Sequence, residues 1–244
     1  MVPKEILSLQ HPIVKEWVEL RLDKEARERS HQVLLMGEKM IQELGAKGFL
    51  QTLITTKPAP TIPASECYLV TPEILKKITG IPAPDGFAAI AKLPEPQDLR
   101  GKQRLLILDR LSDPGNLGTL LRTALGLGWD GVVFTAGTVD PFNDKALRAS
   151  KGALFSLPFC QKASGELGVL FHARTVYLAD LEGTPLDSIS PSPPLALILS
   201  NEAAGPAPWT EKNAEKIAIP MHNGVESLSV ATSGAILLYK LSNL

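Results

Sequence analysis

Polar side chains and glycine meet at the end of an apolar run in the segment DPGNLGTLLRTA, residues 113–124. We expect a strand to give way to a helix here, with Asn116 at the helix cap, where its side chain can accept from a free amide. Gly118 and Arg122 then share one face, and long helical side chains lean toward the N-terminus. Arg122 can therefore pass over Gly118 and hold a phosphate at the mouth of the loop through paired hydrogen bonds.

Two later segments place a carboxylate and two serines in similar positions. LSNEAAGP, residues 199–206, puts Glu202 just beyond an apolar run, where a carboxylate either braces the loop or belongs to a site. IPMHNGVESLSV, residues 219–230, leads through Gly224 to Ser227 and Ser229 at the predicted start of a helix. Each of the three segments, taken alone, also has a structural explanation: a capped helix with a surface arginine, a braced loop, and a serine cap on a packed helix.

Several other kinds of site and location are disfavoured. The sequence has neither the G-x-x-x-x-G-K phosphate cradle nor the G-x-S-x-G nucleophile elbow. Its four histidines and two cysteines lack ligand spacing, so we expect no metal and no disulfide. No apolar run reaches the ~18 residues that span a bilayer, and the N-terminus is too charged for a signal peptide. We expect a cytoplasmic protein without membrane contact.

The elements that must position the three segments follow from hydrophobic patterning. Apolar runs predict strands at 105–111, 131–136, 175–181, 195–200 and 217–221, and helical spacing predicts helices at 117–128, 143–154, 207–216 and 227–241. Nearly continuous apolar strands that alternate with helices indicate an α/β fold with a mainly parallel sheet covered on both faces. Ligands of such sheets bind beyond the carboxyl ends of the strands, so we expect the three segments to converge there.

Prolines separate a smaller N-terminal part from this sheet at about residue 98. Residues 1–98 predict a small α/β module, with helices at 13–27 and 36–47 and strands at 51–55 and 67–71. We expect residues 99–244 to form the larger domain. The net charge is −1, but residues 99–160 carry eight Lys and Arg against five Asp and Glu. That bias suits a local phosphate contact better than a broad basic face for nucleic acid.

Taken together, the segments NLGTLLR, SNEAAG, IPM and ESL, in this order, resemble the SpoU/TrmH family of RNA ribose 2′-O-methyltransferases, within the SPOUT superfamily. RASKGALFSLPF, residues 148–159, also looks like that family's second helix and the segment after it. The resemblance covers residues 103–244. SLQHPIVK and MGEKMIQEL in the first hundred residues are more loosely similar to the family's N-terminal, ribosomal-protein-like RNA-binding extension.

The resemblance implies more than the spacing does. It implies a sheet whose C-terminal segment threads a loop to form a trefoil knot, an exception to the usual unknotted topology. It also implies S-adenosylmethionine as the cofactor, a homodimer, and RNA as the partner, with ribosomal RNA favoured over transfer RNA because of the N-terminal extension. The alternatives are an RNA-binding relative that has lost catalysis and an unrelated α/β enzyme that uses another nucleotide.

Roles for individual residues come from their positions in the family's motifs. Arg122 would hold the target phosphate and hydroxyl, since an arginine stays protonated and is a poor base; the proton acceptor is left open. The implied active-site residues are Asn116, Arg122, Glu202, Ser227 and Ser229, supported by Arg148 and Ser150. The implied cofactor contacts are Thr135, Ser200, Asn201, Gly205, Ile219, Met221 and Leu228.

Three positions depart from the family's usual pattern. Ser229 stands where the family usually has Asn, and a serine hydroxyl offers fewer hydrogen bonds than an amide. Ser200 stands where the second motif usually opens with Gly, and Ala203 replaces another common Gly. Alanine tolerates a positive φ poorly, so these changes bear directly on cofactor binding and catalysis.

Overall fold

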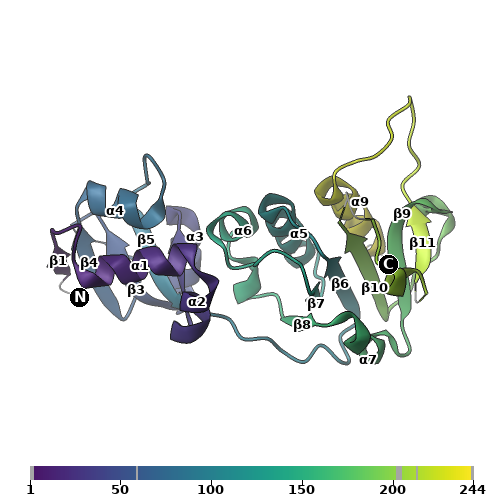
Figure 1. The fold of residues 1–244 in the computed structure, drawn as a ribbon, viewed down its shortest axis with the longest axis horizontal. Coiled ribbons are helices and arrows are strands. Elements are labelled where there is room, and N and C mark those ends of the chain that lie inside the picture. Colours follow the sequence, from purple (N-terminus) through teal and green to yellow (C-terminus); the bar gives the residue numbers. More distant parts are fainter. Residues whose placement is uncertain (1–2, 59, 202–204, 213, 243–244) are drawn as a thin grey trace. The chain divides into compact units, whose positions relative to one another are not determined.

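The computed structural model describes residues 3–58, 60–201, 205–212 and 214–242. Its chain divides into two compact units, one of residues 1–94 with 142–152 and the other of residues 95–141 with 153–244 (Figure 1). Within the described ranges, no helix combines the length and the apolar character that crossing a bilayer requires.

The first unit is a five-stranded mixed sheet with the strand order β1-β4-β3-β5-β2. Helices α1 and α4 pack together and contribute Trp17, Leu20, Ile74 and Ile78 to the apolar core of this unit. The strands are β1 (Lys4–Ile6), β2 (Gln32–Met36), β3 (Leu50–Thr55), β4 (Glu66–Val70) and β5 (Phe87–Lys92). The helices are α1 (Pro12–Leu22), α2 (Lys24–Ser30), α3 (Glu38–Ala46), α4 (Pro72–Thr79) and α6 (Asp144–Ser150).

The single helix predicted at 13–27 is wrong, because it is two helices. Asp23 is extended, with φ −116° and ψ 121°, and ends α1. Its carboxylate accepts a hydrogen bond of 2.9 Å from the amide of Glu25 and so begins α2. Aspartate favours such N-cap positions over helix interiors because its short side chain satisfies free amides.

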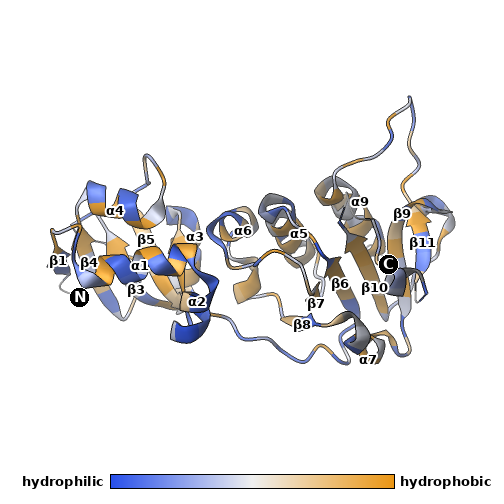
Figure 2. Ribbon diagram, viewed as in Figure 1, coloured by the Kyte–Doolittle hydropathy of each residue, from blue (hydrophilic) through white to orange (hydrophobic). Residues whose placement is uncertain are grey.

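The second unit is a six-stranded sheet with the order β11-β9-β10-β6-β7-β8, and all five pairings in it are parallel. The predicted α/β fold with a mainly parallel sheet is confirmed. Figure 2 shows the apolar character of its central strands. The strands are β6 (Arg104–Asp109), β7 (Gly131–Thr135), β8 (Phe159–Lys162), β9 (Thr175–Pro185), β10 (Leu195–Ser200) and β11 (Glu215–Ala218).

Helices α5 (Pro114–Gly126) and α9 (Val230–Ser242) pack against each other beside this sheet. A Cβ added at Gly234 would lie 2.4 Å from Cδ2 of Leu120 on α5 and 2.6 Å from Cδ1 of Leu199 on β10. A glycine here therefore permits the close approach of α9 to both elements. The short helices α7 (Gly168–Phe171) and α8 (Pro208–Glu211) carry Phe171 and Trp209, whose rings stack and pack on a second apolar cluster.

Two predictions near the C-terminus are wrong in extent. The helix predicted at 207–216 ends with α8, and Glu215 and Lys216 belong to β11, paired with Tyr177 and Leu178. Strand pairing with a distant segment thus overrides a weak helical pattern. The helix predicted from residue 227 begins at Val230, and the Ser229 hydroxyl accepts from the Thr232 amide at 3.3 Å, as a helix cap does.

Candidate active site

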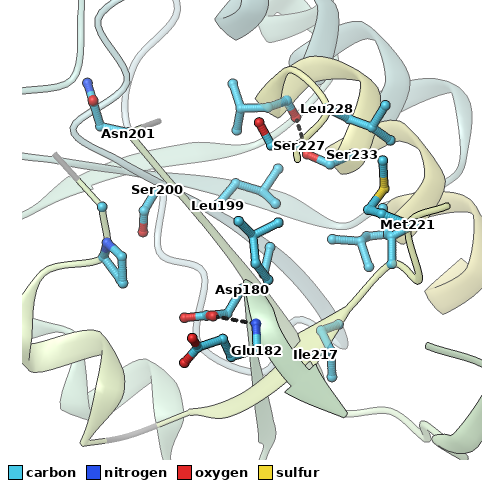
Figure 3. A pocket seen from close by; sticks show the side chains of 17 residues that line it. Asp180, Glu182, Leu199, Ser200, Asn201, Ile217, Met221, Ser227, Leu228 and Ser233 are labelled. Atoms are coloured by element: carbon cyan, nitrogen blue, oxygen red, sulfur yellow. Dashed lines mark hydrogen bonds between the residues drawn. The ribbon is translucent and has the colours of Figure 1, made fainter. Parts of the chain in front are cut away.

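A cavity of about 420 Å³ lies at the carboxyl end of β10, beside the middle of β9 (Figure 3). Its wall is built from the middle of β9, the end of β10 with the loop after it, the segment from β11 to Met221, and the first half of α9 with the residues before it. This is the edge at which a parallel sheet binds ligands, because loops from several strands leave the sheet there.

The cavity brings together residues from two of the three segments singled out in the sequence. The predicted site residues that line it are Ser200, Asn201, Gly205, Ile219, Met221, Ser227 and Leu228. Asn116, Arg122, Thr135 and Ser229 are not part of its wall. Glu202, like Ala203, lies outside the described residues.

The residues just before the first segment are joined to the second segment by hydrogen bonds. The side-chain amide of Asn201 donates to the backbone carbonyl of Arg110 at 2.9 Å and to the Ser112 hydroxyl at 3.3 Å. The loop that precedes α5 is therefore tied to the loop that follows β10.

The position expected for Asn116 at the cap of α5 is wrong. Asp113 is the N-cap, its carboxylate accepts from the Asn116 amide at 2.6 Å, and the helix begins at Pro114. Proline suits the first helical position because its missing N–H would have no partner there. Asn116 thus sits in the first turn of the helix. Arg122 is exposed and makes no hydrogen bond or ion pair with any residue the structure describes, so its guanidinium is available to a ligand.

Arg110 joins the ends of three strands. Its φ of 55° is left-handed, a conformation that is unfavourable for most residues other than glycine. Its backbone amide donates to the Thr135 hydroxyl at 3.1 Å, and its Nη2 donates to the Gly205 carbonyl at 2.7 Å. Its Nε donates to the carboxylate of Asp109 at 3.1 Å.

Asp109 and Thr135 complete this network inside the protein. Both are buried, and the Thr135 hydroxyl donates to the Asp109 carboxylate at 2.8 Å. The hydroxyl of Thr135 is thus committed to protein partners, although the resemblance implied a cofactor contact for this residue. Asp109 and Arg110 were not among the predicted site residues. The signal that could have found them is a charged pair at the very end of an apolar strand.

Arg148 and Ser150 belong to the first unit with α6. Arg148 pairs with Asp144 one turn earlier at 3.3 Å, and its Nη1 lies 3.6 Å from Sδ of Met36. Ser150 is buried, and its hydroxyl donates to the Leu147 carbonyl. Both side chains are engaged within that unit, which favours a structural part for them.

A wide bulge in β9 forms the acidic side of the cavity. Lys216 of β11 pairs with Leu178, but the next residue, Ile217, pairs with Thr184, so residues 179–183 loop out of the ladder. Gly183 permits this geometry, since a Cβ there would lie 2.5 Å from the Ile217 amide nitrogen. Asp180 and Glu182 line the cavity from this bulge, and neither was among the predicted site residues.

Hydrogen bonds fix the bulge from within. The Asp180 carboxylate accepts from the Glu182 amide at 2.9 Å and from Nζ of Lys216 at 3.0 Å. Partial burial by itself raises the pKa of Asp180, but these two contacts outweigh it and hold the pKa below its ordinary value. Asp180 is therefore an ionised brace of the bulge.

The cavity has an apolar part and a polar part that suit a nucleoside. Figure 3 shows Met221, Leu228 and Ile217 on one side, with Ser200, Asp180 and Glu182 toward the other. The Ser200 hydroxyl is buried and has no hydrogen-bond partner among the described residues. A buried polar atom without a partner costs free energy, so a polar ligand group at this hydroxyl would stabilise the site. These residues fit an adenosine-containing cofactor.

Comparison with known proteins decides the family. Residues 103–239 match the model of the SpoU rRNA Methylase family, a span that includes the whole cavity wall. The chain belongs to this family. The predicted resemblance is thereby confirmed.

Relatives of the chain extend over its full length. It is 34% identical to the 23S rRNA (guanosine(2553)-2′-O)-methyltransferase RlmP of Bacillus subtilis, over 98% of this chain and 99% of that protein. The structure of an AdoMet-bound rRNA methyltransferase from Sinorhizobium meliloti superposes with a TM-score of 0.86 at 26% identity, over 99% of this chain and 98% of that one. A putative RNA methyltransferase of the TrmH family from Porphyromonas gingivalis gives a TM-score of 0.83 at 28% identity, over 96% of this chain and 98% of that one.

Proposed function

We propose that this SpoU-family protein transfers a methyl group from S-adenosylmethionine to a ribose 2′-hydroxyl of ribosomal RNA. The observation that carries the proposal is the cavity at the end of β10 and beside the middle of β9, where seven residues selected from the sequence meet. The full-length similarity to RlmP, which is named for 23S rRNA, favours ribosomal RNA as the substrate.

The chain supplies binding and orientation. Ile219, Met221 and Leu228 give an apolar wall for the adenine, and Ser200 gives a hydroxyl that needs a polar partner. The cofactor, when bound, supplies an electrophilic methyl group on a sulfonium. Transfer of such a methyl to an oxygen depends on alignment, so much of the rate enhancement comes from positioning the hydroxyl.

Arg122 and Asn116 in our proposal position the RNA. Arg122 is exposed and uncommitted, and a guanidinium can hold a phosphate with two parallel hydrogen bonds. It remains protonated, so it orients the hydroxyl and does not take its proton. We also assign Ser227, which lies on the cavity wall, and Glu202 to the active site that receives the ribose 2′-hydroxyl.

The proposal also covers the roles of the two domains and the oligomeric state. We assign RNA binding to residues 1–98 and methyl transfer to residues 99–244, the C-terminal part of which threads as a trefoil knot. We also propose a homodimer that covers Ile236 and Tyr239 of α9, whose side chains are exposed. A cytoplasmic location follows from the proposed substrate.

The test is to incubate the purified protein with radiolabelled S-adenosylmethionine and ribosomal RNA from a strain that lacks it. We expect one ribose to be labelled, and mapping would identify the nucleotide. Transfer RNA from the same strain, used in parallel, distinguishes the two RNA classes. An RNA-binding relative without catalysis would bind the RNA and label neither, which would overturn the proposal.

A further inference from the structure

Ser200 and Asp180 come to the same edge of the sheet on neighbouring strands. β10 and β9 are parallel, with Leu195 opposite Thr175 and Ile198 opposite Leu178. Two residues further along each strand stand Ser200 and Asp180, both on the cavity wall. The paired register ends at Ile198 and Leu178, and Figure 3 shows the Ser200 hydroxyl and the Asp180 carboxylate directed toward the same part of the cavity.

The bulge that carries Asp180 also holds Glu182 in place. Gly183 packs against the backbone of Ile217 immediately after Glu182, and Asp180 accepts from the Glu182 amide and from Lys216. Both ends of the short segment are thus fixed by contacts with protein. Asp180 already has a partner at each carboxylate oxygen, which suits a positioning residue.

Two polar groups on this side of the cavity remain uncommitted. The Glu182 carboxylate makes no hydrogen bond or ion pair with any residue described in the structure, and the buried Ser200 hydroxyl likewise has no partner there. Figure 3 shows the Ser200 hydroxyl on the same side of the cavity as the carboxylates of Asp180 and Glu182. The Glu182 carboxylate, which can accept hydrogen bonds, and the Ser200 hydroxyl, which can donate and accept, are therefore both available to one ligand.

We propose that Glu182 and Ser200 bind the 2′,3′-diol of the cofactor's ribose, with Asp180 positioning Glu182; this rests on the proposed function. A diol offers two donors and can accept as well. A carboxylate is a pure acceptor, and a serine hydroxyl does both. The ribose is bonded directly to the adenine, so an adenine on the apolar wall of Met221 and Leu228 places the diol beside it. Dinucleotide enzymes use a carboxylate on a ribose hydroxyl in the same way.

The methionine end of the cofactor carries an ammonium group, which is a second possible partner for a carboxylate. Ligands that lack this end therefore test the inference. A carboxylate that faced the ammonium of that end would also favour the cofactor. 5′-Methylthioadenosine keeps the adenine and the diol but has no ammonium. Its 2′-deoxy and 3′-deoxy forms each lack one hydroxyl.

The experiment measures binding of S-adenosylhomocysteine, 5′-methylthioadenosine and the two deoxy forms by calorimetry, for wild type, Glu182→Gln and Ser200→Ala. We expect Glu182→Gln to weaken S-adenosylhomocysteine and 5′-methylthioadenosine by the same factor, roughly tenfold, as expected for a hydrogen bond to a charged group. Wild type should bind at least one of the deoxy forms more weakly than 5′-methylthioadenosine, by a similar factor. Glu182→Gln should bind that deoxy form and 5′-methylthioadenosine with nearly the same affinity. Ser200→Ala should weaken both diol ligands.

Controls separate the possible failures. Glu215→Gln changes an exposed carboxylate on β11 that does not line the cavity, and should bind every ligand as wild type does. If Glu182→Gln weakens S-adenosylhomocysteine but not 5′-methylthioadenosine, Glu182 faces the ammonium and the inference is overturned. Unchanged affinity for both would overturn it too, with the proposed function intact. If wild type binds neither S-adenosylhomocysteine nor S-adenosylmethionine, the proposed function fails and the inference with it.

Discussion

The guanidinium of Arg110 donates a 2.7 Å hydrogen bond to the backbone carbonyl of Gly205, 95 residues later in the chain. Arg110 follows β6, and Gly205 belongs to the loop after β10 that lines the cavity. The Asn201 side chain returns a bond to the Arg110 carbonyl at 2.9 Å. One residue in a left-handed conformation thus fixes both described ends of the loop that contains Glu202.

Two substitutions of Arg110 should distinguish the effect of losing its hydrogen bonds from the effect of its left-handed backbone. Arg110→Gly keeps the φ of 55° without cost and removes the guanidinium. Arg110→Ala removes the same group but retains a Cβ, which costs about 1–2 kcal/mol in a left-handed conformation. We expect both variants to bind S-adenosylhomocysteine roughly tenfold more weakly, as expected when hydrogen bonds from a charged group are lost. Calorimetry checks this, and wild-type affinity in Arg110→Gly would contradict it.

Thr135→Val should lower stability, because Thr135 bonds with protein partners. The change leaves a carboxylate oxygen of buried Asp109 and the Arg110 amide without the hydroxyl, at a cost of about 1–3 kcal/mol. Urea unfolding measures the loss. Thr123→Val is the control, since the Thr123 hydroxyl bonds only within its own helix. A variant of Thr135 that is as stable as wild type but binds the cofactor poorly would instead support a direct contact.

Gly234→Ala should destabilise the second unit. The new methyl would overlap Leu120 and Leu199, both fully buried, and overpacking of this kind costs about 1–3 kcal/mol. Gly126→Ala is the matched control, because that glycine ends α5 with open space around its Cβ position. Alanine is favoured over glycine in helices by up to about 1 kcal/mol, so the control should be neutral or stabilised in urea unfolding.

Asp180 should make stability depend on pH in the acid range. Its pKa in the folded protein lies below the ordinary 3.8, so the ionised carboxylate stabilises the fold above that value. This contribution is lost as the pH falls through the folded pKa. Asp180→Asn should therefore be less stable than wild type near neutral pH, and the gap should close in acid. Unfolding curves at several pH values test this, and a gap that stays constant down to acid pH would refute it.

Arg122→Lys should reduce methyl transfer by on the order of 100-fold, the scale of a misplaced reactant. Lysine keeps the charge but cannot form the two parallel hydrogen bonds of a guanidinium. Binding of S-adenosylhomocysteine should be unchanged, because Arg122 is not part of the cavity wall. Arg100→Lys, at an exposed arginine paired with Asp98, is the control and should be fully active. Equal loss of cofactor binding in Arg122→Lys would contradict the role proposed for it.

The parallel sheet could be predicted because its strands are marked locally. The apolar runs at 105–111, 131–136 and 195–200 correspond to β6, β7 and β10, each buried on both faces. Edge strands and the strands of the mixed sheet were harder to predict. Strands β1, β2 and β5 of the mixed sheet, edge strand β8 of the parallel sheet and helix α4 have no counterpart among the predicted elements. Short strands of these kinds gain their stability from cross-strand partners, which local patterning does not reveal. Of β11, only Glu215 and Lys216 were assigned to a helix for the same reason, while the strand predicted at 217–221 overlaps its second half.

The parallel α/β sheet, the family and seven residues of the cavity were predictable from the sequence, because apolar periodicity and short motifs are properties of neighbouring residues. That Asp180 and Glu182 line the same cavity, and that Arg110 holds Gly205, became evident only from the folded chain. These depend on a shift in register between β9 and β11 and on a contact across 95 residues. Pairing between distant segments is set by the packing of the whole unit, and no local pattern encodes it.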